Sequence, residues 1–264
     1  MQLFKVKVND YSALHGCFPL VNAYSRLWNR KIFFHGNSDY KKSFLSFAAL
    51  FINVIMEMKE RIQQKAKELF MRYGFRSVTM DEIAGQLGIS KKTVYQFFED
   101  KDSLVEAVMQ KEMNYMHDQC MKQMQEASNA IDEIFNDMDS MEAVIDSMNP
   151  QIIFDLEKFY PKTYEKFKKH KNTFLLEIIK KNLQRGIQEE LYRNDINVDI
   201  IARFRLESSF IAFSQETYPF GKYNLLQVSN EIYFLFIHGV ATPKGKKLIE
   251  KYMQQRQQNK SLAI

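Results

Sequence analysis

The segment of residues 79–101, TMDEIAGQLGISKKTVYQFFEDK, constrains the fold of this chain more than any other. Thr79 and Glu82 have the spacing of a capping box, which predicts that a helix begins directly after Thr79. Gly88 follows the last periodic apolar residue and predicts a left-handed turn that ends this helix. Ser90 can then cap a second helix of about two turns. The segment therefore predicts two short helices joined by a tight turn.

The second of these helices has two different faces. Val94, Phe97 and Phe98 have helical spacing and would pack inward. The outward positions carry no acid and are Lys91, Lys92, Thr93, Tyr95 and Gln96. Such a helix can enter the major groove of DNA, where the lysines and Thr93 would reach bases. Asp100 can cap a third helix, so Lys101 would lie beside free amides and contact a phosphate. The alternative is an ordinary helical hairpin with a solvated basic face, but both caps in register with the turn glycine favour DNA binding.

The same residues resemble the DNA-binding domain of the TetR/AcrR family of transcriptional regulators. The similar run extends from Ile62 to Val108 and includes AKELF, GF, VTMDEIA and LGISKKTVYQFFEDKDSLVEAV. The resemblance implies an all-α homodimer that reads a palindromic operator, and a variable C-terminal body whose small ligand releases the DNA. It also implies DNA contacts for Thr79, Ser90, Lys91, Lys92, Thr93, Tyr95, Gln96 and Lys101. The family often has a small residue at the position of Lys92 and His at that of Gln96, so its base preference does not transfer.

Composition agrees with an all-α fold, because the 264 residues include only five prolines and nine glycines. The net charge of +5 is unevenly placed, since residues 1–57 hold seven basic and three acidic residues, a net +4. Any DNA-binding surface must therefore come from a local cluster of bases. Cys17 and Cys120 lie far apart and suggest no disulfide framework, which fits a reducing cytoplasm.

The chain divides into four predicted segments. Residues 1–57 are an N-terminal extension, 58–104 the TetR-type DNA-binding domain, 105–257 a helical ligand-binding and dimerisation domain, and 258–264 a frayed tail. The extension lacks helical period until the apolar run of residues 43–56, which is too short to span a membrane. Three interpretations remain open for it: translation from a misassigned start upstream of Met56 or Met58, a helical extension packed on the DNA-binding domain, or a membrane-proximal anchor.

Helical periodicity continues through the rest of the chain. An amphipathic helix with an apolar face from Ile62 to Tyr73 should end at Gly74 and close the DNA-binding domain. Further helices are expected over residues 101–127, 131–148, 152–160 and 161–191, and a short terminal helix from Pro243. The helix over residues 225–240 has two apolar stripes, so one side should meet the core and the other a partner subunit. We predict a four-helix homodimer interface built from residues 198–213 and 225–240 of each chain.

The sequence shows no catalytic set, and we expect no metal or cofactor. Its five histidines are unpaired, and it has no Gly-rich phosphate loop, HExxH or GxSxG. His117 with Cys120 is two ligands short of a metal site, and His238 is expected to be a core histidine. The lysine run at 166, 168, 169 and 171 is expected to be a solvated face, with an anionic ligand as the alternative.

Methionine and aromatic side chains could line a cavity for an apolar or amphipathic effector. The candidate lining residues are Met113, Met116, Phe135, Met138, Phe154, Phe174, Phe210 and Phe213, and the alternative is that they form plain core. The sequence thus predicts a cytoplasmic, ligand-responsive repressor that binds double-stranded DNA as a homodimer, without a membrane partner. Two alternatives remain: a structural or nucleoid-associated DNA binder without an inducer, and a small-molecule enzyme, which the missing nucleophile and base argue against.

Overall fold

The computed structural model describes residues 38–262, and it describes side chains between residues 52 and 258. Within that range the regular elements are helices, accompanied by two isolated β-bridges, so the all-α prediction is confirmed. The interpretations of the N-terminal extension fall largely on residues 1–37, outside the described residues, as do Cys17 and two of the histidines. Those interpretations therefore stay predictions.

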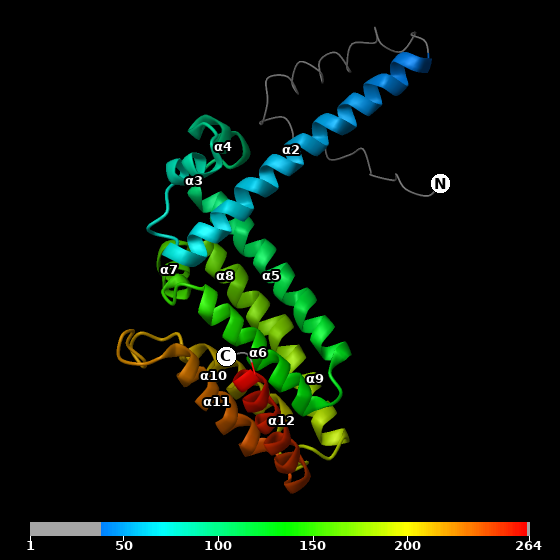
Figure 1. The fold of residues 1–264 in the computed structure, drawn as a ribbon, viewed down its shortest axis with the longest axis vertical. Coiled ribbons are helices and arrows are strands. Elements are labelled where there is room, and N and C mark those ends of the chain that lie inside the picture. The colour runs from blue at the N-terminus through cyan, green and yellow to red at the C-terminus, as the bar shows by residue number, and fades with distance from the viewer. Residues whose placement is uncertain (1–37, 263–264) are drawn as a thin grey trace. The chain divides into compact units, whose positions relative to one another are not determined.

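The helices form two compact units. The head unit contains the described residues up to 68 and residues 78–104, and the body unit contains residues 69–77 and the described residues from 105 onward. Figure 1 shows the helices α2 (Ser38–Tyr73), α3 (Met80–Leu87), α4 (Lys91–Phe97), α5 (Lys101–Glu126), α6 (Ala130–Ser147), α7 (Ile152–Phe159), α8 (Pro161–His170), η3 (Lys171–Leu175), α9 (Leu176–Gln188), α10 (Val198–Ile211), α11 (Leu225–Val240) and α12 (Pro243–Leu262).

Helix α2 is longer than its predicted counterpart. It begins at Ser38 and passes without a break through the predicted boundary between residues 57 and 58. No glycine or proline occurs between residues 38 and 73, so nothing in the chain interrupts the helix. It ends at Gly74, whose φ of 81° only glycine adopts readily. Tyr73 was expected on the apolar face but is 45% exposed, because the last helical residue turns outward and lies against Arg72.

The head unit has a small apolar core that explains its three-helix fold. Ile62 and Ala66 of α2 are fully buried, as is Ile83 of α3, and Val94 is the buried residue of α4. Ala84 is also buried, and its small side chain allows α3 and α4 to pack closely. Phe98, the C-cap of α4, closes the core. Phe97, which was expected to pack inward, is half-buried, whereas Lys91, Lys92 and Tyr95 of α4 are exposed.

The body unit has a larger core built mainly by its later helices. Helix α6 packs on α9, α11 and α12, α9 packs on α10, and α10 packs on α11 (Figure 1). Side chains from all these helices join one cluster of buried apolar residues, which includes Leu183 and Ile237. A buried guanidinium packs against this cluster: Arg205 lies 3.8 Å from the ring centroid of Tyr233 and 3.5 Å from Asp137. That carboxylate accepts a hydrogen bond from Tyr233, so the buried charge is satisfied.

The predicted helix over residues 161–191 is continuous only as far as Gln188 and contains one π turn. Between α8 and α9, residues Lys171–Leu175 form the π-helical segment η3, in which the amide of Leu176 donates to the carbonyl of Lys171. A π turn holds one residue more than an α turn, so it shifts the faces of the following helix. Thr173 donates its hydroxyl to the carbonyl of Lys169 at 2.8 Å and supports the segment.

The end of α9 is fixed by a close approach between Gly186 and Tyr192. A Cβ atom on Gly186 would lie 2.0 Å from Cδ2 of Tyr192, so only glycine fits. The Tyr192 hydroxyl is buried and donates to the carbonyl of Ala130 at 3.1 Å. The chain then turns through Glu190, which has a positive φ of 59°. This arrangement seats α9 on the start of α6.

The terminal helix α12 was expected to be short but extends from Pro243 to Leu262. The predicted frayed tail therefore begins inside a helix. After Gly245 the sequence contains no proline or glycine, and lysine, glutamine and arginine favour helix.

Candidate nucleic-acid interface

The turn between α3 and α4 has the local geometry that the sequence predicted. The hydroxyl of Thr79 accepts from the amide of Glu82 at 3.1 Å, which caps α3. Gly88 has a φ of 67° and ends the helix in the left-handed region. Ser90 caps α4 by accepting from the amide of Thr93 at 3.1 Å. Both helix boundaries are thus set by side chains a few residues away.

The first turn of α5 is capped in the same way. The carboxylate of Asp100 accepts from the amide of Ser103 at 2.7 Å, and the Ser103 hydroxyl donates to the carbonyl of Asp100. The cap leaves Lys101 at the N-terminus of α5, where a helix favours negative charge on a ligand.

Four of the eight predicted DNA-contact residues lie around one hollow in the head unit. Thr79, Lys91, Tyr95 and Lys101 line a space of about 330 Å³ together with Val78, Met80 and Asp81. The other four predicted residues do not line it: Lys92 and Ser90 are exposed, while Thr93 and Gln96 are half-buried. Hydroxyl and ammonium groups around a shallow hollow can hold the oxygens of a phosphate.

Asp81 is the charged residue of this hollow that the sequence did not indicate. The ammonium of Lys91 lies 2.8 Å from Oδ1 of Asp81, so the acid-free face of α4 is neutralised locally by an acid of α3. The hydrogen bond to Asp81, and then its charge, raises the pKa of Lys91. Both side chains are more than half exposed, at 58% and 60%, so the pair is open to water and to competing anions. No local pattern reveals it, because the partners are ten positions apart and meet only when α3 crosses α4.

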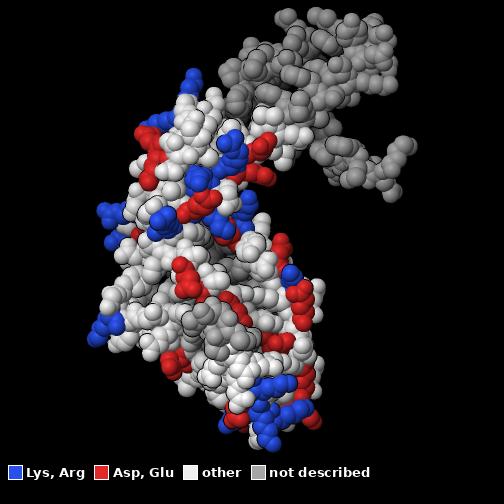
Figure 2. Space-filling model, viewed as in Figure 1, with Lys and Arg blue, Asp and Glu red and all other residues white. Residues whose placement is uncertain are grey.

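Hydroxyl groups in α4 also have partners within the head unit. The Ser90 and Thr93 hydroxyl oxygens are 2.8 Å apart, and the Ser90 oxygen also serves the helix cap. Either hydroxyl would therefore have to contact DNA while it also keeps its hydrogen bond within α4. On the face drawn in Figure 2, basic side chains are interspersed with acidic ones over the described surface.

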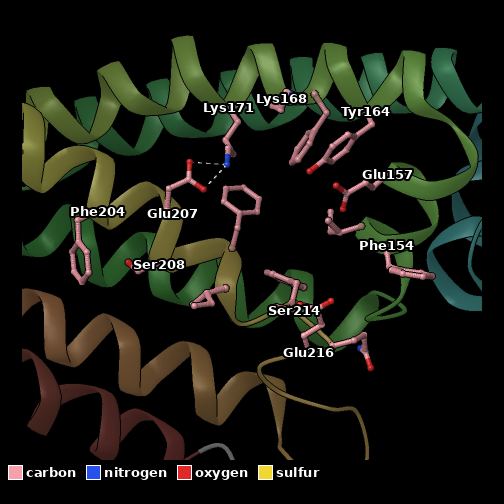
Figure 3. A pocket seen from close by; sticks show the side chains of 16 residues that line it. Phe154, Glu157, Tyr164, Lys168, Lys171, Phe204, Glu207, Ser208, Ser214 and Glu216 are labelled. Atoms are coloured by element: carbon pink, nitrogen blue, oxygen red, sulfur yellow. Dashed lines mark hydrogen bonds and ion pairs between the residues drawn. The ribbon is translucent and has the colours of Figure 1, made fainter.

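The predicted ligand-binding residues are divided between the core and one cavity. Phe154, Phe210 and Phe213 line a space of about 710 Å³ in the body unit (Figure 3). Met113, Phe135 and Met138 are instead at most 4% exposed, and the last two belong to the main apolar core. Met116 is half-buried, and Phe174 stacks between the rings of two histidines, 117 and 170. Helical spacing alone could not separate these two environments.

The lysine run of α8 and η3 is largely matched by carboxylates. Lys166 pairs with Glu106 at 2.5 Å, Lys168 with Glu165 at 2.6 Å and Lys171 with Glu207 at 2.9 Å. The run is therefore a set of ion pairs more than a free basic surface.

The described residues contain no cluster of three or more potential metal ligands. Burial, together with the nearby carboxylates of Asp137 and Glu133, raises the pKa of Cys120 to about 12, so this thiol stays protonated. His238 was expected in the core but is exposed, because it lies on the side of α11 that the other described helices leave uncovered. Among the described helices, none is both long and apolar enough to cross a bilayer.

The two sides of α11 differ sharply in exposure. Tyr233, Phe236, Ile237 and Val240 are at most 5% exposed, as expected for the side that meets the core. On the other side, Leu235 is 73% exposed. Helix α10 has a similar exposed stripe formed by Ile200, Phe204 and Ile211.

Comparison with known proteins finds sequence similarity to one family in the head unit. Residues 62–108 match the model for bacterial regulatory proteins of the tetR family. The transcriptional repressor KstR2 of Mycolicibacterium smegmatis is 22% identical over 199 residues, which cover 72% of this chain and 93% of that protein. A TetR-family regulator from Agrobacterium tumefaciens shares the fold with a TM-score of 0.59 and 15% identity, over 71% of this chain and 99% of that one. A protein described as a transcriptional regulator from Saccharomonospora viridis, solved with choline, has a TM-score of 0.58 and 16% identity, over 71% and 99% of the two chains.

Proposed function

The chain belongs to the TetR family of DNA-binding transcriptional regulators, and from this premise we propose that it is a ligand-responsive repressor that binds a palindromic operator as a homodimer. It is a regulator and not an enzyme. The observation that carries the proposal is the hollow beside α4, where four side chains suited to DNA contact surround one space.

The contacts of the head unit divide into two kinds. Thr79, Tyr95 and Lys101 hold phosphate oxygens and set the register of the protein on the duplex. Lys91 and Lys92 of α4 reach base edges with Thr93, because the N-terminal turn of a recognition helix enters the major groove. The remaining predicted residues, Ser90 and Gln96, contact the DNA backbone.

The homodimer forms through α10 and α11 of each subunit. Their exposed apolar side chains, above all Leu235 and Ile200, are unusual on a solvated surface and are covered in a two-fold four-helix interface. The half-sites of the operator are then separated by one helical turn of DNA or a multiple, roughly 34 to 36 Å per turn.

The effector is an apolar or amphipathic small molecule that occupies the cavity of the body unit. The cavity volume of about 710 Å³ suits a compound of drug size, and most of its lining is hydrophobic. Occupation of the body unit lowers the affinity for the operator, and the protein acts in the cytoplasm.

The proposal is tested by sequencing the genomic DNA fragments that the purified protein captures, with and without cell extract. Palindromic sites should be enriched, and extract that contains the effector should reduce their capture. Enrichment without any palindrome would contradict a dimeric repressor and favour a structural DNA binder.

Two substitutions test how the contacts are divided. Lys92→Ala should relax the sequence preference at one position of the site, whereas Lys101→Ala should weaken binding to all sequences alike and reduce the salt slope by about one. Equal effects of the two substitutions on sequence preference would refute the division into base and phosphate contacts.

A further inference from the structure

The cavity of the body unit has walls of an unusual composition. It lies between α7, α8 and α10 and the loop that follows α10 (Figure 3). Six aromatic side chains line it: Phe154, Tyr164, Phe167, Phe204, Phe210 and Phe213. The rings of Phe167 and Phe210 pack edge to face with their centroids 5.8 Å apart, which turns aromatic surface toward the space.

The charged side chains of the walls leave an excess of carboxylates. Glu157, Glu207 and Glu216 line the cavity, against Lys168 and Lys171. Lys171 lies 2.9 Å from both oxygens of Glu207, as the dashed lines in Figure 3 mark, and its side chain is only 13% exposed.

The other lysine is neutralised from outside the cavity. Lys168 pairs at 2.6 Å with Glu165, which is not a lining residue. Among the residues that the structure describes, Glu157 and Glu216 form no ion pair with a lysine or arginine. The cavity therefore keeps two carboxylates outside any ion pair of the described residues, and the ammonium of Lys168, which is already paired with Glu165, acts on Glu157 only through its charge.

The walls already show how a cation is held there. The ammonium of Lys171 lies 5.0 Å from the ring centroid of Phe210, and that of Lys168 lies 5.9 Å from the ring centroid of Tyr164. Both distances are in the range of cation–π attraction. Burial, and then the charge of Glu157, raises the pKa of Tyr164, so the phenol stays neutral beside the carboxylate.

One polar group of the wall is left without a partner within the described structure. The side-chain nitrogen Nε2 of Gln215 is buried and makes no hydrogen bond, while its oxygen accepts from the amide of Phe220. A buried amide donor without an acceptor is costly. A bound molecule with an oxygen acceptor would satisfy it.

We propose that this cavity binds an amphipathic organic cation, with an ammonium group between the aromatic rings and the Glu157 and Glu216 carboxylates. An anionic ligand would meet these two charges, while the lysines are already engaged. A neutral apolar ligand would remove water from the carboxylates without replacing the hydrogen bonds that the water made, which is unfavourable. The assignment deepens the proposed function, because the cation would be the effector that releases DNA.

The test is isothermal titration calorimetry of the full chain with three probes of similar shape: benzyltrimethylammonium, its neutral isostere neopentylbenzene, and the anion phenylmethanesulfonate. The cation should bind at least about tenfold more tightly than the neutral isostere, as a cation–π contact together with carboxylate attraction allows. The anion should bind most weakly. Equal or tighter binding of either comparison compound, or no binding of any probe, would overturn the proposal.

Substitutions locate the site. The double variant Glu157→Gln and Glu216→Gln should lose about tenfold in affinity for benzyltrimethylammonium while its affinity for neopentylbenzene stays unchanged. Glu250→Gln on α12 removes the same kind of charge from an exposed position outside the cavity and should change neither affinity. Equal losses of affinity in the double variant and in Glu250→Gln would show that the cation responds only to the net charge of the protein. The bound cation would then lie outside the cavity.

A DNA-binding measurement separates this proposal from the proposed function. If benzyltrimethylammonium binds with the expected preference but leaves the affinity for captured operator DNA unchanged, the cation site stands and the role as inducer fails. If DNA is released by other compounds while no cation binds, the regulator stands and the cation site fails.

Discussion

The ion pair between Lys91 and Asp81 predicts an unusual gain of function in the head unit. Asp81→Asn keeps the size of the side chain but removes the carboxylate that lies 2.8 Å from the lysine ammonium. Lys91 is then available to a phosphate or a base without first leaving a partner. We therefore expect Asp81→Asn to bind DNA more tightly than the unaltered protein.

The size of the gain follows from the exposure of the pair. Because both side chains are more than half exposed, solvent screens their attraction, and the affinity for duplex DNA should rise by only about two- to fivefold. A lysine that gains a phosphate contact releases one more counterion, so the slope of log affinity against log salt should become steeper by about 0.9.

Fluorescence anisotropy with a labelled duplex, measured over a series of salt concentrations, gives both quantities. A double-mutant cycle with Lys91→Ala separates release of the lysine from a general change in charge. In the Lys91→Ala background, Asp81→Asn should have little effect. Glu82→Gln is the matched control, because it removes a neighbouring exposed acid of α3 that forms no ion pair with a lysine or arginine among the described residues, and it should give a smaller gain.

The same gain from Asp81→Asn with and without Lys91 would refute the reasoning. It would mean that the acid acts on DNA directly and that the ion pair does not restrain the lysine.

Three further predictions concern the body unit and its partner. Gly186→Ala should lower the free energy of unfolding by about 2 kcal/mol in urea titrations, because the added methyl group overlaps Tyr192. Gly85→Ala, whose added methyl group meets nothing within 4 Å, should be neutral or stabilising. Similar free energies for the two variants would contradict the close packing of Gly186. Leu235→Glu should convert the homodimer into a folded monomer in sedimentation experiments, and a persistent dimer would exclude the α11 interface. Burial lowers the pKa of His170, so the folded protein favours the neutral ring. The stability that the neutral ring contributes at about pH 7 is lost as the pH falls through this lowered pKa. His170→Gln should therefore show a smaller loss of thermal stability between about pH 7 and pH 5, and an unchanged loss would assign the pH dependence to other groups.

The parts of the fold that the sequence predicted well depend on neighbours a few residues away. Thr79, Gly88 and Ser90 set the boundaries of α3 and α4 through contacts within four positions, so their pattern is visible in the sequence. The two stripes of α11 are equally local, although the sequence did not indicate that the stripe from Tyr233 to Val240 is the buried one. The π turn at Lys171–Leu175 was not predicted, because its residue types are compatible with an α-helix.

The candidate ligand site was predicted less well because it depends on distant segments. Phe154 and Phe210 reach one cavity only because α7 and α10 fold against α8. Phe135 and Met138 have the same chemistry and the same helical spacing, yet they lie in the core. The acidic residues that give the cavity its charge were not singled out at all, since an isolated glutamate on a helix is usually solvated.

The π turn of η3 gives this body unit a way to change its ligand without disturbing its core. Lys171 lies at the start of the turn and lines the cavity, whereas Leu176 and Leu183 beyond it are buried among core side chains. A π turn accommodates its extra residue locally, so loss of one residue would restore α-helical winding and change which side chains of Lys171–Leu175 face the cavity, while α9 keeps its orientation on the core. A one-residue deletion in this segment should therefore alter the cavity wall around Lys171 and leave the packing of Leu176 and Leu183 unchanged.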